Sequence, residues 1–114
     1  MNESKNIFIN SLNRELSKLL EILLENPDSS SKCAIPKIRN MLIMLEEFKY
    51  DDSYDNSTFF KNISKQYQSM FVPKMGLSEF NIWDDDFEIR TKKNKEYSNI
   101  LENINKILNR NELF

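Results

Sequence analysis

The chain has 114 residues, of which 39% are hydrophobic and 30% charged, and its formal net charge is −2. This length and apolar content favour a single domain, residues 1–114, with a hydrophobic core, and they argue against an intrinsically disordered chain. One glycine and three prolines are too few turn residues for an all-β protein, and the absence of histidine excludes histidine-dependent catalytic triads.

Two amphipathic helices are predicted in the first half of the chain. Apolar residues recur at helical spacing over residues 4–26, and Pro27 ends the pattern because the residue before a proline is disfavoured in the α conformation. We predict a polar loop at residues 29–32 and then a second helix to about Phe48, with Pro36 in its first turn. Because short connections favour neighbouring elements, the two helices are expected to form an antiparallel hairpin.

A third helix is predicted after a polar linker at residues 50–56. Ser57 or Thr58 is expected to cap this helix, since hydroxyl side chains bond the free N–H groups of a helix start. The apolar stripe of the helix ends near Met70. Residues 71–83 follow, and their alternation of apolar and polar side chains leaves room for a short extended segment.

A last helical region begins after Trp83, with three consecutive aspartates in its first turn, where the helix dipole favours negative charge. The apolar pattern fades between Phe87 and Tyr97 and is strong again afterwards. This stretch is either a surface-exposed helix or a break near Asn94, and of the two we expect the break, which gives two shorter helices. The predicted fold class is all-α, a four- or five-helix bundle with room for a short extended segment within residues 71–83.

The sequence contains no recognisable catalytic, metal-binding or cofactor-binding motif. Cys33 is the only cysteine, and without a histidine to activate its thiol we interpret it as structural. A calcium-binding loop that starts at Asp51 would need glycine at its sixth position and glutamate at its twelfth, where the chain has Asn56 and Asn62. A single glycine also cannot build a phosphate-binding loop. We predict that the protein is not an enzyme and binds no metal or cofactor.

The charge is unevenly distributed along the chain. Residues 46–88 carry ten acidic and four basic side chains, a net charge of −6, between flanks of +1 and +3. A negative field attracts basic proteins and repels phosphates, so we expect a protein partner and no nucleic acid. The strongly apolar stretch at residues 19–24 is too short to cross a membrane, and the N-terminus does not resemble a signal peptide. The expected location is the cytoplasm.

Acidic and aromatic residues are mixed in two segments, and we predict that these segments bind the partner. Tryptophan and tyrosine are frequent at interface hot spots, and acidic rims speed the capture of a basic partner. Two interpretations of the aromatic residues stay open: Phe80, Ile82 and Trp83 either close the end of the bundle or contact the partner. The predicted partner-binding residues are Asp51, Asp52, Tyr54, Asp55, Glu79, Trp83, Asp84, Asp85 and Asp86.

The segment Gly76-Leu77-Ser78-Glu79-Phe80-x-Ile82-Trp83-x-x-Asp86-Phe87-x-x-Arg90-x-x-x-Asn94 is similar to a pattern in small bacterial proteins. An acidic, histidine-free helical chain of this size resembles the immunity proteins that neutralise polymorphic or contact-delivered toxins. The resemblance implies stoichiometric inhibition, in which an acidic surface covers a basic toxin domain, often a nuclease. The alternative is a phage or host adaptor or inhibitor that binds a different protein, and a carboxylate-based metalloenzyme is a third hypothesis. The sequence leaves the oligomeric state open.

Overall fold

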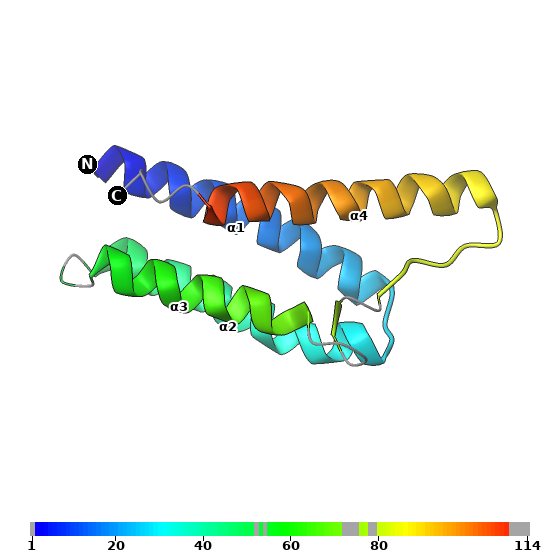
Figure 1. Cartoon of the computed structure of the whole chain (residues 1–114), viewed down its shortest axis with the longest axis horizontal. Coiled ribbons are helices and arrows are strands. Elements are labelled where there is room, and N and C mark those ends of the chain that lie inside the picture. The colour runs from blue at the N-terminus through cyan, green and yellow to red at the C-terminus, as the bar shows by residue number, and fades with distance from the viewer. Residues whose placement is uncertain (1, 52, 54, 72–75, 78–79, 110–114) are drawn as a thin grey trace.

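Helices make up most of the described chain (Figure 1). The computed structural model describes residues 2–51, 53, 55–71, 76–77 and 80–109. The α-helices are α1 (Asn2–Glu25), α2 (Ser29–Tyr50), α3 (Asn56–Gln68) and α4 (Phe87–Leu108), and a short 3₁₀-helix η1 (Ser69–Phe71) follows α3. These residues contain no β-strand, and the predicted all-α bundle is confirmed.

The helices are arranged as two neighbouring pairs. α1 packs along both α2 and α4, and α2 also packs against α3. The order around the bundle is therefore α4, α1, α2, α3, and Figure 1 shows α4 lying along α1 and α3 lying along α2. The molecule is elongated, with extents of 49 × 24 × 20 Å. Within the described residues, the backbones of α3 and α4 do not approach each other as closely as those of the other three neighbouring pairs.

One cluster of buried apolar side chains fills the space between the four α-helices. Its members from these helices include Phe8, Leu12, Leu16, Leu19, Leu23, Ile38, Met41, Leu45, Phe48, Phe59, Ile63, Tyr67, Tyr97, Ile100, Ile104 and Leu108. The rings of Phe48 and Phe59 stack with their centroids 3.9 Å apart and join α2 to α3. Contact between aromatic rings adds to the stabilisation that burial alone provides.

Glu15 of α1 is the one charged side chain buried within the described residues, and it faces α4. The carboxylate accepts a hydrogen bond from Asn103 Nδ2 at 2.9 Å, and it lies 3.3 Å from Lys18 Nζ and 3.7 Å from Arg14 Nε. A buried carboxylate is tolerated when it is hydrogen-bonded and paired in this way. The interaction ties α1 to α4 by a directional contact, in addition to apolar packing.

The loop predicted at residues 29–32 is wrong, because these residues form the first turn of α2. Asp28 caps the helix: its Oδ1 accepts a hydrogen bond from the Ser31 N–H at 2.8 Å, and the Asp28 N–H donates to Ser31 Oγ at 2.7 Å. This reciprocal capping box satisfies two free donors of the helix start. Pro36 consequently lies inside α2 and not in its first turn, where it has no N–H to donate to the Lys32 carbonyl.

The start of α3 differs from the prediction in its capping residue. Asp55, and not Ser57 or Thr58, is the N-cap. Its Oδ2 accepts hydrogen bonds from the Thr58 N–H at 2.9 Å and from Thr58 Oγ1 at 2.7 Å. Thr58 therefore donates both hydrogen bonds to the cap. The carboxylate of Asp55 accepts them and satisfies a free N–H group of the helix start.

The break predicted near Asn94 is also wrong, because α4 is one continuous helix. Its buried side chains begin only at Tyr97, and every described side chain from Phe87 to Glu96 is exposed or half-buried. The faded apolar pattern thus marks a half-helix that extends beyond the core. It does not mark an interruption of the helix.

Candidate partner-binding surface

The segment that leads into α4 alternates buried and exposed side chains. Phe80 and Ile82 are buried in the core, whereas Asn81 and Trp83 are exposed. The Phe80 ring packs against Tyr97 of α4 with the ring centroids 5.0 Å apart. This alternation is that of a β-strand, yet the described residues offer no strand beside it. Of the two interpretations left open by the sequence, the first holds for Phe80 and Ile82, which belong to the core, whereas Trp83 is exposed.

Asn94 of α4 takes the place of a neighbouring strand. Its Oδ1 accepts a hydrogen bond from the Ile82 N–H at 2.9 Å, and its Nδ2 donates to the Ile82 carbonyl at 2.9 Å. The same Nδ2 donates to the Arg90 carbonyl, also at 2.9 Å, which fixes the orientation of the amide. The residue at which the sequence predicts a break therefore holds the extended segment against α4 and positions Trp83, the next residue along.

Trp83, Phe87 and Arg90 form a cluster that we call the aromatic–arginine patch. The Arg90 guanidinium lies 4.3 Å from the Trp83 ring centroid and 5.2 Å from that of Phe87. A cation over an aromatic face is attracted by the negative charge of the ring face. Trp83 Nε1 also donates to Asp85 Oδ1 at 3.3 Å. Although both rings are restrained by these contacts, each is 68% exposed.

The carboxylates beside the patch help to build the start of α4. Asp86 is the N-cap, and its Oδ1 accepts hydrogen bonds from the N–H groups of Glu88 at 2.9 Å and Ile89 at 3.2 Å. Asp84 Oδ1 accepts the Asp86 N–H at 2.9 Å, and Asp84 Oδ2 lies 3.7 Å from Lys93 Nζ. Negative charge at a helix start is favourable. These aspartates therefore have a structural role whether or not a partner binds.

The other predicted acidic segment forms the connection between α2 and α3. Asp51 Oδ1 accepts hydrogen bonds from the Ser53 N–H at 3.0 Å and from Ser53 Oγ at 2.6 Å. The hydrogen bonds from the side chain and the backbone of Thr58 hold the pKa of the Asp55 carboxyl below its ordinary value. Both aspartates are exposed, and both shape the turn before α3.

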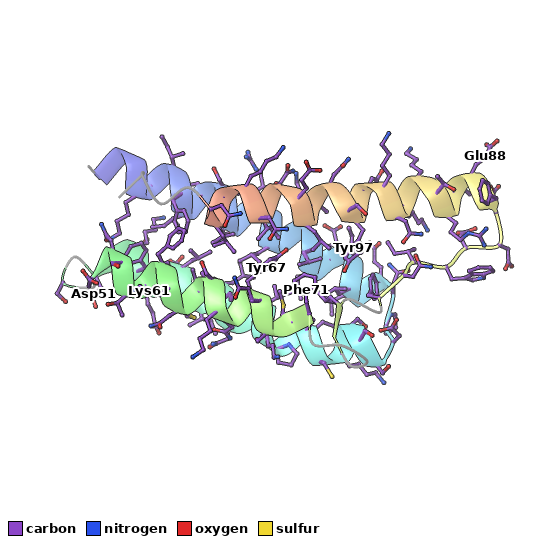
Figure 2. All side chains as sticks on the ribbon, viewed as in Figure 1. Asp51, Lys61, Tyr67, Phe71, Glu88 and Tyr97 are labelled. Carbon is purple, nitrogen blue, oxygen red and sulfur yellow. The ribbon has the colours of Figure 1, made fainter. Side chains whose placement is uncertain are left out.

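The two acidic segments lie at opposite ends of the molecule. Figure 2 shows Asp51 at one end and Glu88 at the other, along an axis of 49 Å. The predicted binding residues therefore divide into two surfaces, and one compact interface does not cover both. Asp52, Tyr54 and Glu79 belong to the predicted set but lie outside the described residues.

Phe87 and Arg90 are absent from the predicted set although they complete the patch around Trp83. Their spacing of three residues places them on one face of a helix. This spacing is the one feature of the sequence that could have indicated that they lie together. The continuous helix and the extended approach of Trp83 bring the three residues together, and neither feature is visible in the local pattern.

Three further findings concern metal binding, the cysteine and membrane insertion. They contain no group of three or more histidine, cysteine, aspartate or glutamate side chains that is arranged to hold a metal ion. Cys33 is exposed on α2. No helix in the described ranges combines the length and the apolar character needed to cross a bilayer. Comparison with known proteins found no matching protein family, no matching curated protein and no matching solved structure.

Proposed function

We propose that this protein acts by stoichiometric binding of a protein partner, and that the aromatic–arginine patch is the centre of the contact. The observation that carries the proposal is the 68% exposure of both Trp83 and Phe87. The large side chains just before them, Phe80 and Ile82, are buried. Tryptophan and arginine are among the residues that contribute most to binding at interfaces. Because Arg90 already holds both rings, little side-chain freedom is lost when a partner covers them.

The charges around the patch favour a partner with a basic surface. Asp85, Asp86 and Glu88 are exposed, and Lys93 is paired with Asp84. Acidic groups at the rim of an interface raise the association rate of a basic protein and contribute specificity. The apolar rings would then contribute most of the binding free energy, and the carboxylates would steer the encounter.

The specific function we propose is neutralisation of a toxin in the cytoplasm, the role of immunity proteins. Its support is the small helical fold, the acidic residues beside exposed aromatic rings and the resemblance of type described above. In this role the patch covers a basic toxin domain and blocks its active site. The alternative is an adaptor or inhibitor that uses the same surface for a different protein.

Replacing Trp83 with alanine tests the surface, with the product of the neighbouring gene as the probe. A tight complex with the tagged full chain, together with survival of cells that express the neighbour, is the expected result for an immunity protein. The W83A variant should bind about 30-fold more weakly, the loss typical of a hot-spot residue. Ile43→Ala is the matched control, because Ile43 is 57% exposed on α2 and lies outside the patch.

A second variant tests the carboxylates separately from the rings. Asp85→Asn combined with Glu88→Gln removes two charges but leaves the Asp86 cap in place. We expect slower association and a weaker dependence of binding on salt. Unchanged binding at low and at high salt would remove these carboxylates from the interface. Absence of a complex and of rescue would favour the adaptor alternative.

A further inference from the structure

A groove of about 1120 Å³ lies along the side of the bundle where α3 and α4 are not closely packed. It begins near the connection between α2 and α3 and reaches the last turn of α4, away from the aromatic–arginine patch. Its volume exceeds the roughly 300–1,000 Å³ of most small-molecule pockets. A ligand that fills it is therefore larger than a typical metabolite.

The walls of the groove are rich in side-chain amides. Asn56 and Gln68 come from α3, Asn105 comes from α4, and Asn109 follows α4 directly. Each primary amide offers both donors and an acceptor, the same combination that a peptide backbone presents. An extended peptide exposes its N–H and C=O groups at every residue, whereas a helix satisfies them internally and needs an apolar groove. The walls thus suit an extended chain.

Two hydroxyl groups behind the walls are buried and have no hydrogen-bond partner among the described residues. They are Ser64 Oγ and Tyr67 Oη, both on α3. Tyr67 is only 3% exposed, and Figure 2 shows it in the space between α3 and α4, where Tyr97 also lies. Both oxygens are buried, so they lie beneath the surface that a ligand in the groove would contact.

Two lysines give the groove its charge preference. Lys61 and Lys65 line it from α3, and the ion pairs within the described residues involve other side chains. The acidic residue in the walls is Asp55, whose carboxylate is bonded by Thr58 at the helix start and is also attracted by Lys61. Two lysines and one aspartate give the lining a net charge of +1, which favours carboxylates. Nucleic acid is disfavoured, because its bases need exposed aromatic faces for stacking and the aromatic residues here are buried or half-buried.

We propose that the α3–α4 groove binds an extended, acidic peptide segment of a protein partner. The amides bond the peptide backbone, and Lys61 and Lys65 pair with its carboxylate side chains. This site does not depend on the aromatic–arginine patch, so the protein has one surface for a basic partner and another for an acidic segment.

The probe is a library of short random peptides displayed on phage and selected on the full chain. We expect the selected peptides to be enriched in aspartate and glutamate. A Lys61→Gln, Lys65→Gln variant should bind them about tenfold more weakly, the loss expected for two partly exposed charge pairs. The matched control is Lys92→Gln, Lys95→Gln, which removes the same charge from exposed positions of α4 and should leave binding unchanged. Far-UV circular dichroism of both variants checks that they fold.

The location of binding is read from amide chemical shifts in the NMR spectrum. Shifts that change at Ser64, Gln68 and Asn105 but not at Trp83 would support the groove. Selection without acidic enrichment, or equal binding by the two lysine variants, would overturn the proposal. Shifts confined to the patch would also overturn the groove proposal, without affecting the proposed function. The W83A variant should still bind the selected peptides. Concentration-dependent self-association that the Lys61→Gln, Lys65→Gln variant abolishes would assign the groove to a second copy of the chain instead.

Discussion

Replacing Asn94 with alanine removes the three hydrogen bonds that its side chain makes to the backbone of Ile82 and Arg90. The Ile82 N–H and C=O then lose the partner that stands in for a neighbouring strand. The extended segment is left with the apolar packing of Phe80 and Ile82, and Trp83 loses its fixed position relative to α4. We expect lower stability and a changed environment of the tryptophan.

The magnitude follows from the bonds lost and the helix propensity gained. A typical intramolecular hydrogen bond contributes about 0.5–1.5 kcal/mol net, so the two bonds to Ile82 amount to about 1–3 kcal/mol. The bond to the Arg90 carbonyl adds little, since that carbonyl also accepts a backbone bond in the helix. Alanine is a better helix former than asparagine by up to about 0.7 kcal/mol. The free energy of unfolding should therefore fall by about 0.3–3 kcal/mol.

Urea unfolding followed by circular dichroism measures this loss, and tryptophan emission reports on the segment because Trp83 is the only tryptophan. Asn99→Ala is the matched control, since Asn99 is an exposed asparagine of the same helix, and it should be neutral or slightly stabilising. If Asn94→Ala were as stable as Asn99→Ala and its emission were unchanged, the role assigned to Asn94 would be incorrect.

Three further substitutions test the core and the helices. Glu15→Ala should lower the free energy of unfolding by about 1–3 kcal/mol because it removes a buried, hydrogen-bonded carboxylate. Glu21→Ala, at an exposed site of α1, should change the free energy of unfolding by less than about 0.5 kcal/mol. Equal effects of the two substitutions would contradict this assignment. Burial raises the pKa of Tyr97 from 10.0 to about 12, so the unfolded chain ionises first and stability should fall as the pH rises from 10 to 12. A Tyr97→Phe variant that loses the same stability over this range in thermal melts would refute the assignment. Pro36→Ala restores a donor inside α2 and should raise the free energy of unfolding by about 1–3 kcal/mol, and a lower melting temperature would count against it.

The helices could be predicted from sequence wherever one face is buried. The apolar spacing of α1 matches the buried stripe from Phe8 to Leu23, because periodicity reports burial directly. The start of α2 was also encoded, since Asp28 and Ser31 are spaced as a capping box. The preference of proline for the first turn of a helix predicted instead that α2 begins near Pro36. The helix begins earlier, at the capping box, because Ser31 and Ala34 are buried there, whereas Pro36 is exposed.

The candidate site could be predicted only in part. Trp83 and the aspartates before α4 are recognisable as an aromatic and acidic mixture, but the continuity of α4 is not, since residues 87–96 bury nothing. That half-helix depends on the Asp86 cap and on the bonds of Asn94, and neither produces an apolar period. The separation of the two acidic segments depends on how α4 lies along α1, which no local pattern contains.

The exposed first half of α4 also bears on how such a protein can evolve. Residues 87–96 contain no buried side chain, and substitutions at exposed positions usually change stability by less than about 0.5 kcal/mol. Under the proposed function, recognition and folding draw on different residues of one helix, and they meet mainly at Asn94 and Asp86. Apart from these two anchors, mutations in this half-helix would then alter which partner is recognised while the fold keeps nearly all of its stability.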